Sequence, residues 1–312
     1  MKSFKSFLTE NIKDVVDEKY LIKELTSGKF KNNLKYVYDT AKSVPNAEHP
    51  DGLLYRGMSD SFVNVNPITL LHYSTERVSA NTSNMYNVLV SKYLPSWKDY
   101  PKRNKSFICS TSAERAKSYT EDGDPCIIVP TDSARIGICS SYDFWYSFPH
   151  MKKSLNVAAM SGFNRMLQTF MTNLSRIFGI DVEDVNMYVR EEGDISEKNL
   201  LNITKFLKNI TPNELQNRKT EYEAKTSDDK AELLPFDNMY KYLINNTDVD
   251  QNKNIDLIKI LDDLLDPQTN NFTIGNFGDS IKHENSEVWM EGPAILISNI
   301  HVFVEICDRY YK

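Results

Sequence analysis

The chain has 312 residues and a mass of 36.0 kDa, and its 40% hydrophobic and 26% charged residues are typical of a globular protein rather than of a disordered or fibrous one. Its longest uncharged run near the C-terminus, residues 293–304, is too short for a membrane-spanning helix, which needs about 20 residues. With only 11 glycines and a formal net charge of -6, the chain fits neither glycine-rich dinucleotide-binding repeats nor a protein built to bind phosphate backbones.

The first half of the chain predicts helices followed by short strands. Residues 11–43 repeat apolar side chains at spacings of three and four, which predicts two helices separated near Gly28. A short strand is expected over residues 53–58 and a helix over 81–97, ended by Pro95. We expect further strands over 105–110, 126–129 and 135–139, with a helical turn over 113–119 after the first of them.

The second half predicts a long helical block and then a return to strands. Helical patterns cover residues 155–178, 196–210, 211–225, 230–245 and 250–265. The block is acidic, because residues 181–270 carry 20 Asp and Glu against 11 Lys and Arg. Strands are expected again over 287–290, 294–297 and 301–304. We therefore divide the chain into N-terminal helices and the first part of a β-rich core (11–149), an acidic helical insertion (150–270) and C-terminal strands that complete the core (271–312).

Cysteine and histidine positions favour neither disulfides nor metal. Four cysteines at positions 109, 126, 139 and 307 form no C-x-x-C pair, which indicates buried, reduced thiols and a cytosolic setting. The five histidines show no metal-binding spacing, so no metal is expected. Phosphate-binding loops, nucleophile elbows and Rossmann glycine motifs are also missing from the sequence.

Three short segments carry side chains suited to chemistry. Arg56, followed by Gly57, ends an expected strand, where a guanidinium can grip a diphosphate; the alternative is a solvated or salt-bridged surface arginine. The Ser110-Thr111-Ser112 segment offers hydroxyls at another strand end, or simply a helix cap at Ser112.

Glu287 opens the third of these segments. A carboxylate fixed at a strand edge is suited to stabilise positive charge developing on a sugar. The alternative is an ordinary charge that protects an edge strand from aggregation.

In this order, Tyr-Arg-Gly, Ser-Thr-Ser and Glu-Val-Trp, each on an expected strand, resemble the arginine-serine-glutamate class of mono-ADP-ribosyltransferases. The resemblance implies an α+β fold with a pair of β-sheets around an NAD cleft, N-terminal helices and here a large helical insertion. Arg56 and Gly57 would bind NAD with Ser110, Thr111 and Ser112, and Glu287 would hydrogen-bond the nicotinamide ribose during bond cleavage. NAD would be the substrate, and no metal would be needed.

The resemblance is incomplete at the position that orients the acceptor. Two residues before the catalytic glutamate the family commonly has Glu or Gln, whereas this chain has Asn285, with Glu284 one residue further away. Arginine is therefore not the expected acceptor, and NAD hydrolysis without an acceptor is an alternative. Phe277 and Phe272, in the loop before Glu287, either contact the acceptor or anchor the loop on the core.

Residues 1–10, which end in Leu8-Thr9-Glu10, resemble the capsid-targeting leaders of tailed bacteriophages related to the T-even group, although they also fit the start of the first helix. They lack the apolar core of a secretion signal. The resemblance implies a virion-packaged protein that modifies a host protein in the host cytoplasm, with no membrane partner and with a nucleic-acid acceptor left open. The alternative in a different class is an inactive internal or structural virion protein with the same fold.

Overall fold

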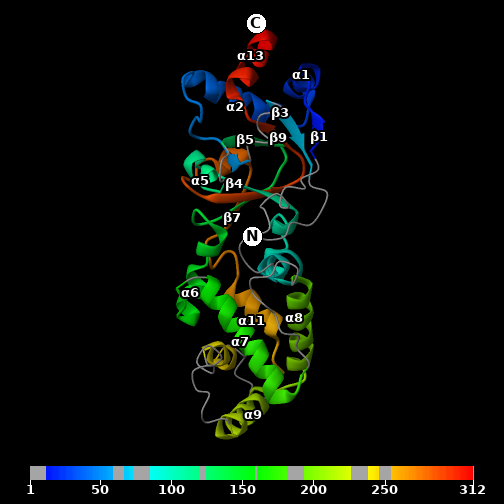
Figure 1. Cartoon of the computed structure of the whole chain (residues 1–312), viewed down its shortest axis with the longest axis vertical. Helices are drawn as coiled ribbons and strands as arrows, with labels where there is room; N and C mark the ends of the chain where they lie inside the picture. The colour runs from blue at the N-terminus through cyan, green and yellow to red at the C-terminus, as the bar shows by residue number, and fades with distance from the viewer. Residues whose placement is uncertain are drawn as a thin grey trace, which may run out of the picture. The chain divides into compact units, whose positions relative to one another are not determined.

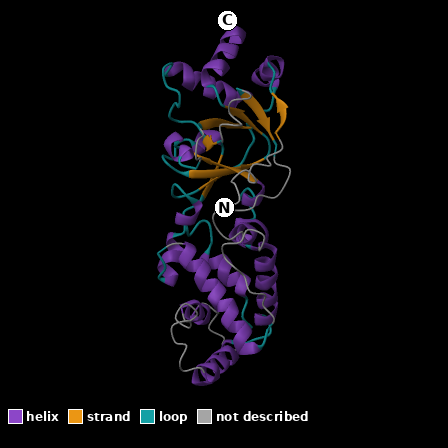
Figure 2. Ribbon diagram, viewed as in Figure 1, coloured by secondary structure: helices purple, strands orange, loops and turns teal. Residues whose placement is uncertain are grey.

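The computed structural model describes residues 12–58, 67–72, 85–119, 124–158, 160–180, 193–225, 238–245 and 254–311. The leader expected over residues 1–10 lies outside them. The chain divides into two compact units, of which the first takes Met1–Arg77, Tyr100–Ser147 and Asn271–Lys312 and the second takes Val78–Asp99 and Phe148–Asn270. In Figure 2 the strands belong to the first unit, and the described part of the second consists of helices and loops. The helical unit thus also includes residues 78–99, which the sequence analysis assigned to the core.

The first unit is built around one antiparallel sheet. Its strands are β1 (Ile12–Val15), β2 (Tyr55–Gly57), β3 (Ile68–Leu71), β4 (Ser106–Ser110), β5 (Pro125–Pro130), β6 (Ile136–Ile138), β7 (Thr273–Gly275), β8 (Glu287–Glu291) and β9 (Ala294–Ile297). They lie in the order β1-β3-β9-β5-β2-β4-β8-β6-β7. Strands β5 and β9 are continuous apolar runs and are buried along their whole length, as expected for strands covered on both faces.

The sheet is joined at its middle by a single residue pair. Strand β2 pairs with β5 at three positions but with β4 only where Tyr55 faces Ser110. The α+β class is confirmed. The strands of the described residues form one antiparallel sheet, and the predicted pair of sheets is not shown. An NAD cleft remains a prediction.

Helices of the first unit cover the sheet and form its core. They are α1 (Glu18–Ser27), α2 (Lys31–Ser43), α5 (Ala113–Lys117), α12 (Phe277–Ser280), α13 (Ile300–Tyr311) and the single 3-10 turns η4 (Arg103–Lys105) and η5 (Phe144–Tyr146). In Figure 1, α1, α2 and α13 lie together beside β3 and β9. Leu21, Leu34 and Phe303, one from each helix, are fully buried there.

Four elements of the first unit differ from the sequence analysis. Residues 12–15, expected to be helical, form strand β1, and β3 and β7 were not predicted. The strand expected over residues 301–304 is wrong, because these residues belong to helix α13. Ile300, Phe303 and Cys307 are its buried residues, and their spacing of three and four is that of one helix face.

The second unit is helical in its described residues. It contains α4 (Met85–Val88), the π-helical η2 (Leu89–Tyr93), the 3-10 turn η3 (Pro95–Trp97), α6 (Pro149–Leu155), α7 (Met160–Phe178), α8 (Gly193–Leu207), α9 (Pro212–Lys225), α11 (Leu257–Leu264) and helical residues 238–245. The indole N–H of Trp97 donates to the Leu265 carbonyl at 3.0 Å, and the hydroxyl of Ser96 donates to Asp262 at 2.6 Å. These bonds attach residues 85–99 to the insertion.

All four cysteines are buried free thiols, as predicted. Burial raises the pKa of Cys126 to about 12, so this thiol stays protonated and unreactive at neutral pH. Among the helices of the described residues, none combines the length and the apolarity that crossing a membrane requires.

Gly137 on β6 lies against a buried indole ring. It pairs with Trp289 on β8, and a Cβ added to Gly137 would lie 2.2 Å from a ring carbon of Trp289. The ring cannot move aside easily, because its N–H donates to the Pro101 carbonyl at 2.8 Å. We expect Gly137→Ala to lower the free energy of unfolding by about 1–3 kcal/mol through overpacking.

Urea unfolding of the purified protein measures this loss. The control is Gly162→Ala inside α7, where the nearest atom to an added Cβ is 3.4 Å away and alanine favours the helix. Equal stability of the two variants would contradict the prediction.

Candidate functional site

The three predicted motifs lie on three neighbouring strands of the first unit. Tyr55 on β2 pairs with Ser110 on β4, and Ser110 pairs with Glu287 on β8. Residues directly opposite each other in antiparallel strands point to the same face of a sheet. The structure therefore brings Ser110 and Glu287 together as neighbours, although the whole helical insertion separates them in sequence.

The Ser-Thr-Ser segment fixes the strand end on which Glu287 lies. The Thr111 hydroxyl accepts the Ser286 N–H at 2.8 Å, and the Thr111 N–H donates to the Ser286 carbonyl at 3.0 Å. The Ser112 hydroxyl caps α5 by accepting the Arg115 N–H at 3.2 Å, so the helix-cap alternative is correct for this residue. The Ser110 hydroxyl accepts the Ser112 N–H at 3.1 Å and shapes the turn.

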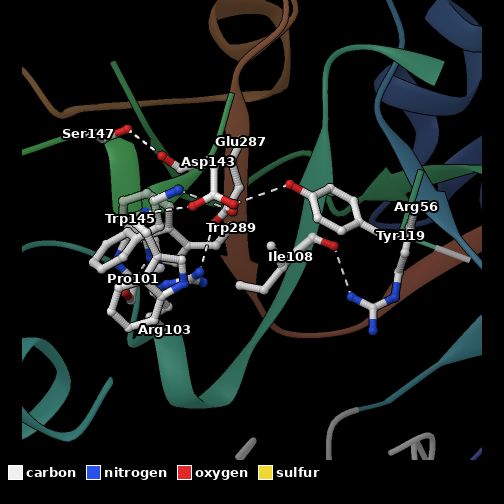
Figure 3. Close-up of polar contacts among 11 residues, drawn as sticks. Arg56, Pro101, Arg103, Ile108, Tyr119, Asp143, Trp145, Ser147, Glu287 and Trp289 are labelled. Atoms are coloured by element: carbon white, nitrogen blue, oxygen red, sulfur yellow. Dashed lines mark hydrogen bonds and ion pairs between the residues drawn. The ribbon is translucent and has the colours of Figure 1, made fainter. Parts of the chain in front are cut away.

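The Glu287 carboxylate is held from two sides. Its Oε1 lies 2.8 Å from Nη2 of Arg103, and its Oε2 accepts the backbone N–H of Phe144 at 3.3 Å. The Arg103 and Glu287 side chains are only 6% and 8% exposed, respectively. Figure 3 shows the two side chains pointing toward each other. Glu287 is thus a nearly buried carboxylate with a fixed orientation and a paired charge, and not an exposed charge at the edge of the sheet.

Arg103 lies in turn η4, which is anchored to the same strand as Glu287. The Trp289 indole N–H donates to the carbonyl of Pro101, just before this turn, at 2.8 Å. The Arg103 guanidinium stacks over the Phe144 ring at 4.3 Å from its centre. One strand therefore carries both the carboxylate and the side chain that anchors its cationic partner.

Arg56 takes a different direction from the row of Tyr55, Ser110 and Glu287. Successive side chains of a strand point to opposite faces, so Arg56 faces away from Tyr55. Its Nη1 donates to the Ile108 carbonyl of β4 at 2.9 Å, beyond the single pair that joins β2 and β4. In Figure 3 Arg56 is turned toward this carbonyl and Glu287 toward Arg103. The guanidinium lies at the edge of β4, and Gly57 follows it opposite Pro125.

A tyrosine and a second carboxylate lie close to Glu287. The Tyr119 hydroxyl, at the end of α5, donates to Oδ2 of Asp143 at 3.3 Å. Partial burial of Tyr119 and the negative charges of Asp143 and Glu287 raise its pKa above the usual value, with Arg115 opposing them. Tyr119 therefore stays a hydrogen-bond donor at neutral pH.

The residues predicted to contact an acceptor lie in different surroundings: Asn285 precedes β8, whereas Phe277 and Phe272 are buried in the core. Asn285 has a left-handed backbone, with φ of 51°, just before β8. Phe277 and Phe272 are each 3% exposed. Phe277 belongs to the core cluster, and Phe272 packs against Trp289. Both rings anchor the loop on the core, which fits the alternative given for them, and the acceptor contact of Phe277 stays a prediction.

The sequence analysis did not identify Arg103, Tyr119, Asp143 or Phe144. Arg103 belongs to a basic run, residues 102–105, that reads as an ordinary exposed turn. Asp143 and Phe144 come just after a predicted strand, which was the only local signal available. Their role depends on contacts with β8, which comes more than 140 residues later in the sequence.

Comparison with other proteins gives no direct guide to the site. No family model, curated protein or solved structure matches the chain. Within the described residues, His, Cys, Asp and Glu form no group of three or more that could hold a metal ion. The functional argument therefore rests on the side chains themselves.

Proposed function

We propose that the protein is an NAD-dependent mono-ADP-ribosyltransferase that modifies a host protein. One observation carries the proposal: the strands bearing the Arg, Ser-Thr-Ser and Glu motifs are adjacent, and the residue pairs Tyr55–Ser110 and Ser110–Glu287 form one row across them. If the three short segments matched the family only by chance, they would not be expected to lie on adjacent strands. The motif order and the strand order support the same function.

The chemistry required matches the side chains around Glu287. Cleavage of the bond between nicotinamide and ribose develops positive charge on the sugar, which a fixed carboxylate stabilises without a metal. In this proposal Glu287 accepts a ribose hydroxyl hydrogen bond, and Ser110 supports the strand end. Arg56 lies at the edge of β4 and outside the row of Ser110 and Glu287, so its binding of an NAD phosphate rests on the motif resemblance and on the fit of a planar guanidinium to phosphate oxygens.

Asn285 favours NAD hydrolysis as a second activity. It occupies the position at which the family that the chain resembles orients an acceptor with Glu or Gln, and it is shorter than either side chain. Water would then accept the ADP-ribose. Nicotinamide release in buffer alone distinguishes this activity from transfer, which needs an acceptor protein.

A different observation favours an inactive protein. The Glu287 carboxylate is 8% exposed and already paired with Arg103. In an inactive internal or structural virion protein with the same fold, this ion pair would serve the fold alone. Absence of both nicotinamide release and saturable NAD binding would establish that alternative.

The deciding experiment adds labelled NAD to the purified chain, in buffer and in bacterial lysate. We expect nicotinamide release and label on a lysate protein. Arg56→Lys should raise KM for NAD by about 10- to 100-fold, because an ammonium loses the two-pronged phosphate contact. Arg309→Lys is the control, since Arg309 on α13 pairs with Glu18 and Glu305 and is 52% exposed. An unchanged KM in Arg56→Lys would contradict the role of Arg56.

A further inference from the structure

We infer that Arg103 is a positioning residue that fixes the Glu287 carboxylate in its reactive orientation and keeps it ionised. This inference rests on the proposed function. It assigns a role to a side chain that belongs to none of the three motifs. The contacts of Arg103, the anchoring of its turn and the charges around Glu287 carry the argument.

The orientation of Glu287 depends on two donors from different parts of the chain. Arg103 contacts one carboxylate oxygen at 2.8 Å, and the Phe144 N–H contacts the other at 3.3 Å. A carboxylate held at both oxygens cannot rotate freely about its last side-chain bond. Arg103 supplies the shorter contact of the two, an ion pair between opposite charges, so it favours this orientation more strongly than the neutral N–H does.

The guanidinium is itself held in place. Its ring partner Phe144 also supplies the second donor to Glu287, and the turn that carries it is anchored by the indole of Trp289. Lys102, next in the chain to Arg103, uses its carbonyl to accept the Ser106 hydroxyl at 2.8 Å. The position of Arg103 thus follows from β8 and η5, the two elements that also define the site of Glu287.

Hydrogen bonding around Arg103 suits a role toward Glu287 better than a purely structural one. Within the described residues, its Nε and Nη1 are buried without a hydrogen-bond partner. A buried ion pair contributes to stability only when its remaining donors are satisfied, because both charges lose their hydration. The ion pair therefore adds little to the stability of the fold. Its main effect is to hold the Glu287 carboxylate in place and to balance its charge.

The charges that face Glu287 make its ionisation depend on Arg103. Asp143, just before η5, is a second negative charge. Tyr119, just after α5, and Cys139, after β6, are neutral at pH 7 because burial and these carboxylates raise their pKa values. Arg115 is a further cation, but it stacks on the Tyr142 ring at 3.9 Å. Arg103 is the cation in direct contact with the carboxylate. Without it, burial and Asp143 both favour the protonated acid, which cannot stabilise a cationic sugar.

The test compares pH profiles of NAD cleavage for the wild type, Arg103→Gln and Arg103→Lys. Arg103→Gln should lower kcat at pH 7 by about 10- to 100-fold and move the acid limb of the profile up by about 1–3 pH units, with KM for NAD little changed. Arg103→Lys should leave the acid limb in place, because it keeps the charge, and lower kcat less. The matched control is Lys105→Gln, which removes an exposed positive charge from the same turn.

A second readout does not depend on activity. In protein labelled with carbon-13 at glutamate side chains, the Glu287 signal, assigned by its loss in Glu287→Gln, should titrate at a higher pH in Arg103→Gln than in the wild type. If Arg103→Gln does not fold, the unchanged acid limb and reduced kcat expected of Arg103→Lys still test the inference.

An Arg103→Gln variant with wild-type kcat, acid limb and Glu287 titration would overturn the inference while leaving the proposed function intact. A wild-type chain that neither cleaves nor binds NAD would overturn the proposed function itself and the catalytic part of this inference. The titration would then decide only whether Arg103 keeps Glu287 ionised.

Discussion

Glutamine in place of Glu287 is expected to lower kcat for nicotinamide release by about 100- to 1,000-fold, because the neutral side chain keeps the shape but loses the negative charge that stabilises the cationic sugar. KM for NAD should change little if Glu287 acts mainly in the transition state. Steady-state release of nicotinamide, followed by chromatography, measures both constants. A neutral glutamine also loses the ion pair with Arg103 and leaves that buried cation unpaired, so assays belong well below the thermal midpoint of the variant.

Glu284→Gln is the matched control for this change. Glu284 lies three residues before Glu287 in the same loop and is exposed. It should release nicotinamide at the wild-type rate. Undiminished release by Glu287→Gln would remove Glu287 from the mechanism, and an equal loss in both variants would point to a general effect of acidic charge near β8.

The largest effect on stability is expected from Arg103→Met, which should lower the free energy of unfolding by about 3–5 kcal/mol by leaving the Glu287 charge buried and unpaired. The loss should shrink as the pH falls. An unpaired buried carboxylate has a higher pKa in the folded than in the unfolded state, so the folded variant gains stability when it binds the proton. Urea unfolding between pH 5 and pH 8 measures the loss and its direction.

The double variant Arg103→Met with Glu287→Leu distinguishes the effect of the ion pair on stability from the effect of the other contacts of Arg103. Apolar side chains in place of both charges should restore most of the lost stability, since a buried pair is often replaceable without net cost. A double variant as unstable as Arg103→Met alone would show that the aromatic stacking of Arg103 on Phe144, and not its charge, supports the fold.

Local sequence pattern predicted those elements whose burial follows from their own residues. Strands β5 and β9 are short apolar runs buried throughout, and α9 starts at Thr211, whose hydroxyl accepts the Glu214 N–H at 3.2 Å as its cap position predicted. Helix α13 was mistaken for a strand because the apolar residues 302–304 fit both periods. Its helical face shows only when Ile300 and Cys307 are included.

The candidate site was predictable only in part. Motif order identified Ser110 and Glu287, and the register places them side by side. Arg103 could not be predicted from the sequence, since nothing in a run of basic residues indicates which one is buried. That depends on Trp289 and Phe144, which come from distant parts of the sequence. The attachment of residues 85–99 to the helical unit could not be predicted for the same reason, since it rests on long-range bonds such as that from Ser96 to Asp262.

The pairing of β4 with β8 also sets the order in which the protein can mature on the ribosome. Residues 106–110 are synthesised long before residues 287–291, and residues 148–270 of the helical unit emerge between them. Until β8 arrives, one edge of β4 has no partner, and Arg103 has no carboxylate to bind. Long-range pairings of this kind form slowly. The nascent chain therefore cannot assemble the Glu287 site before β8 has been synthesised, which keeps any activity of this site from appearing in chains that stop before β8.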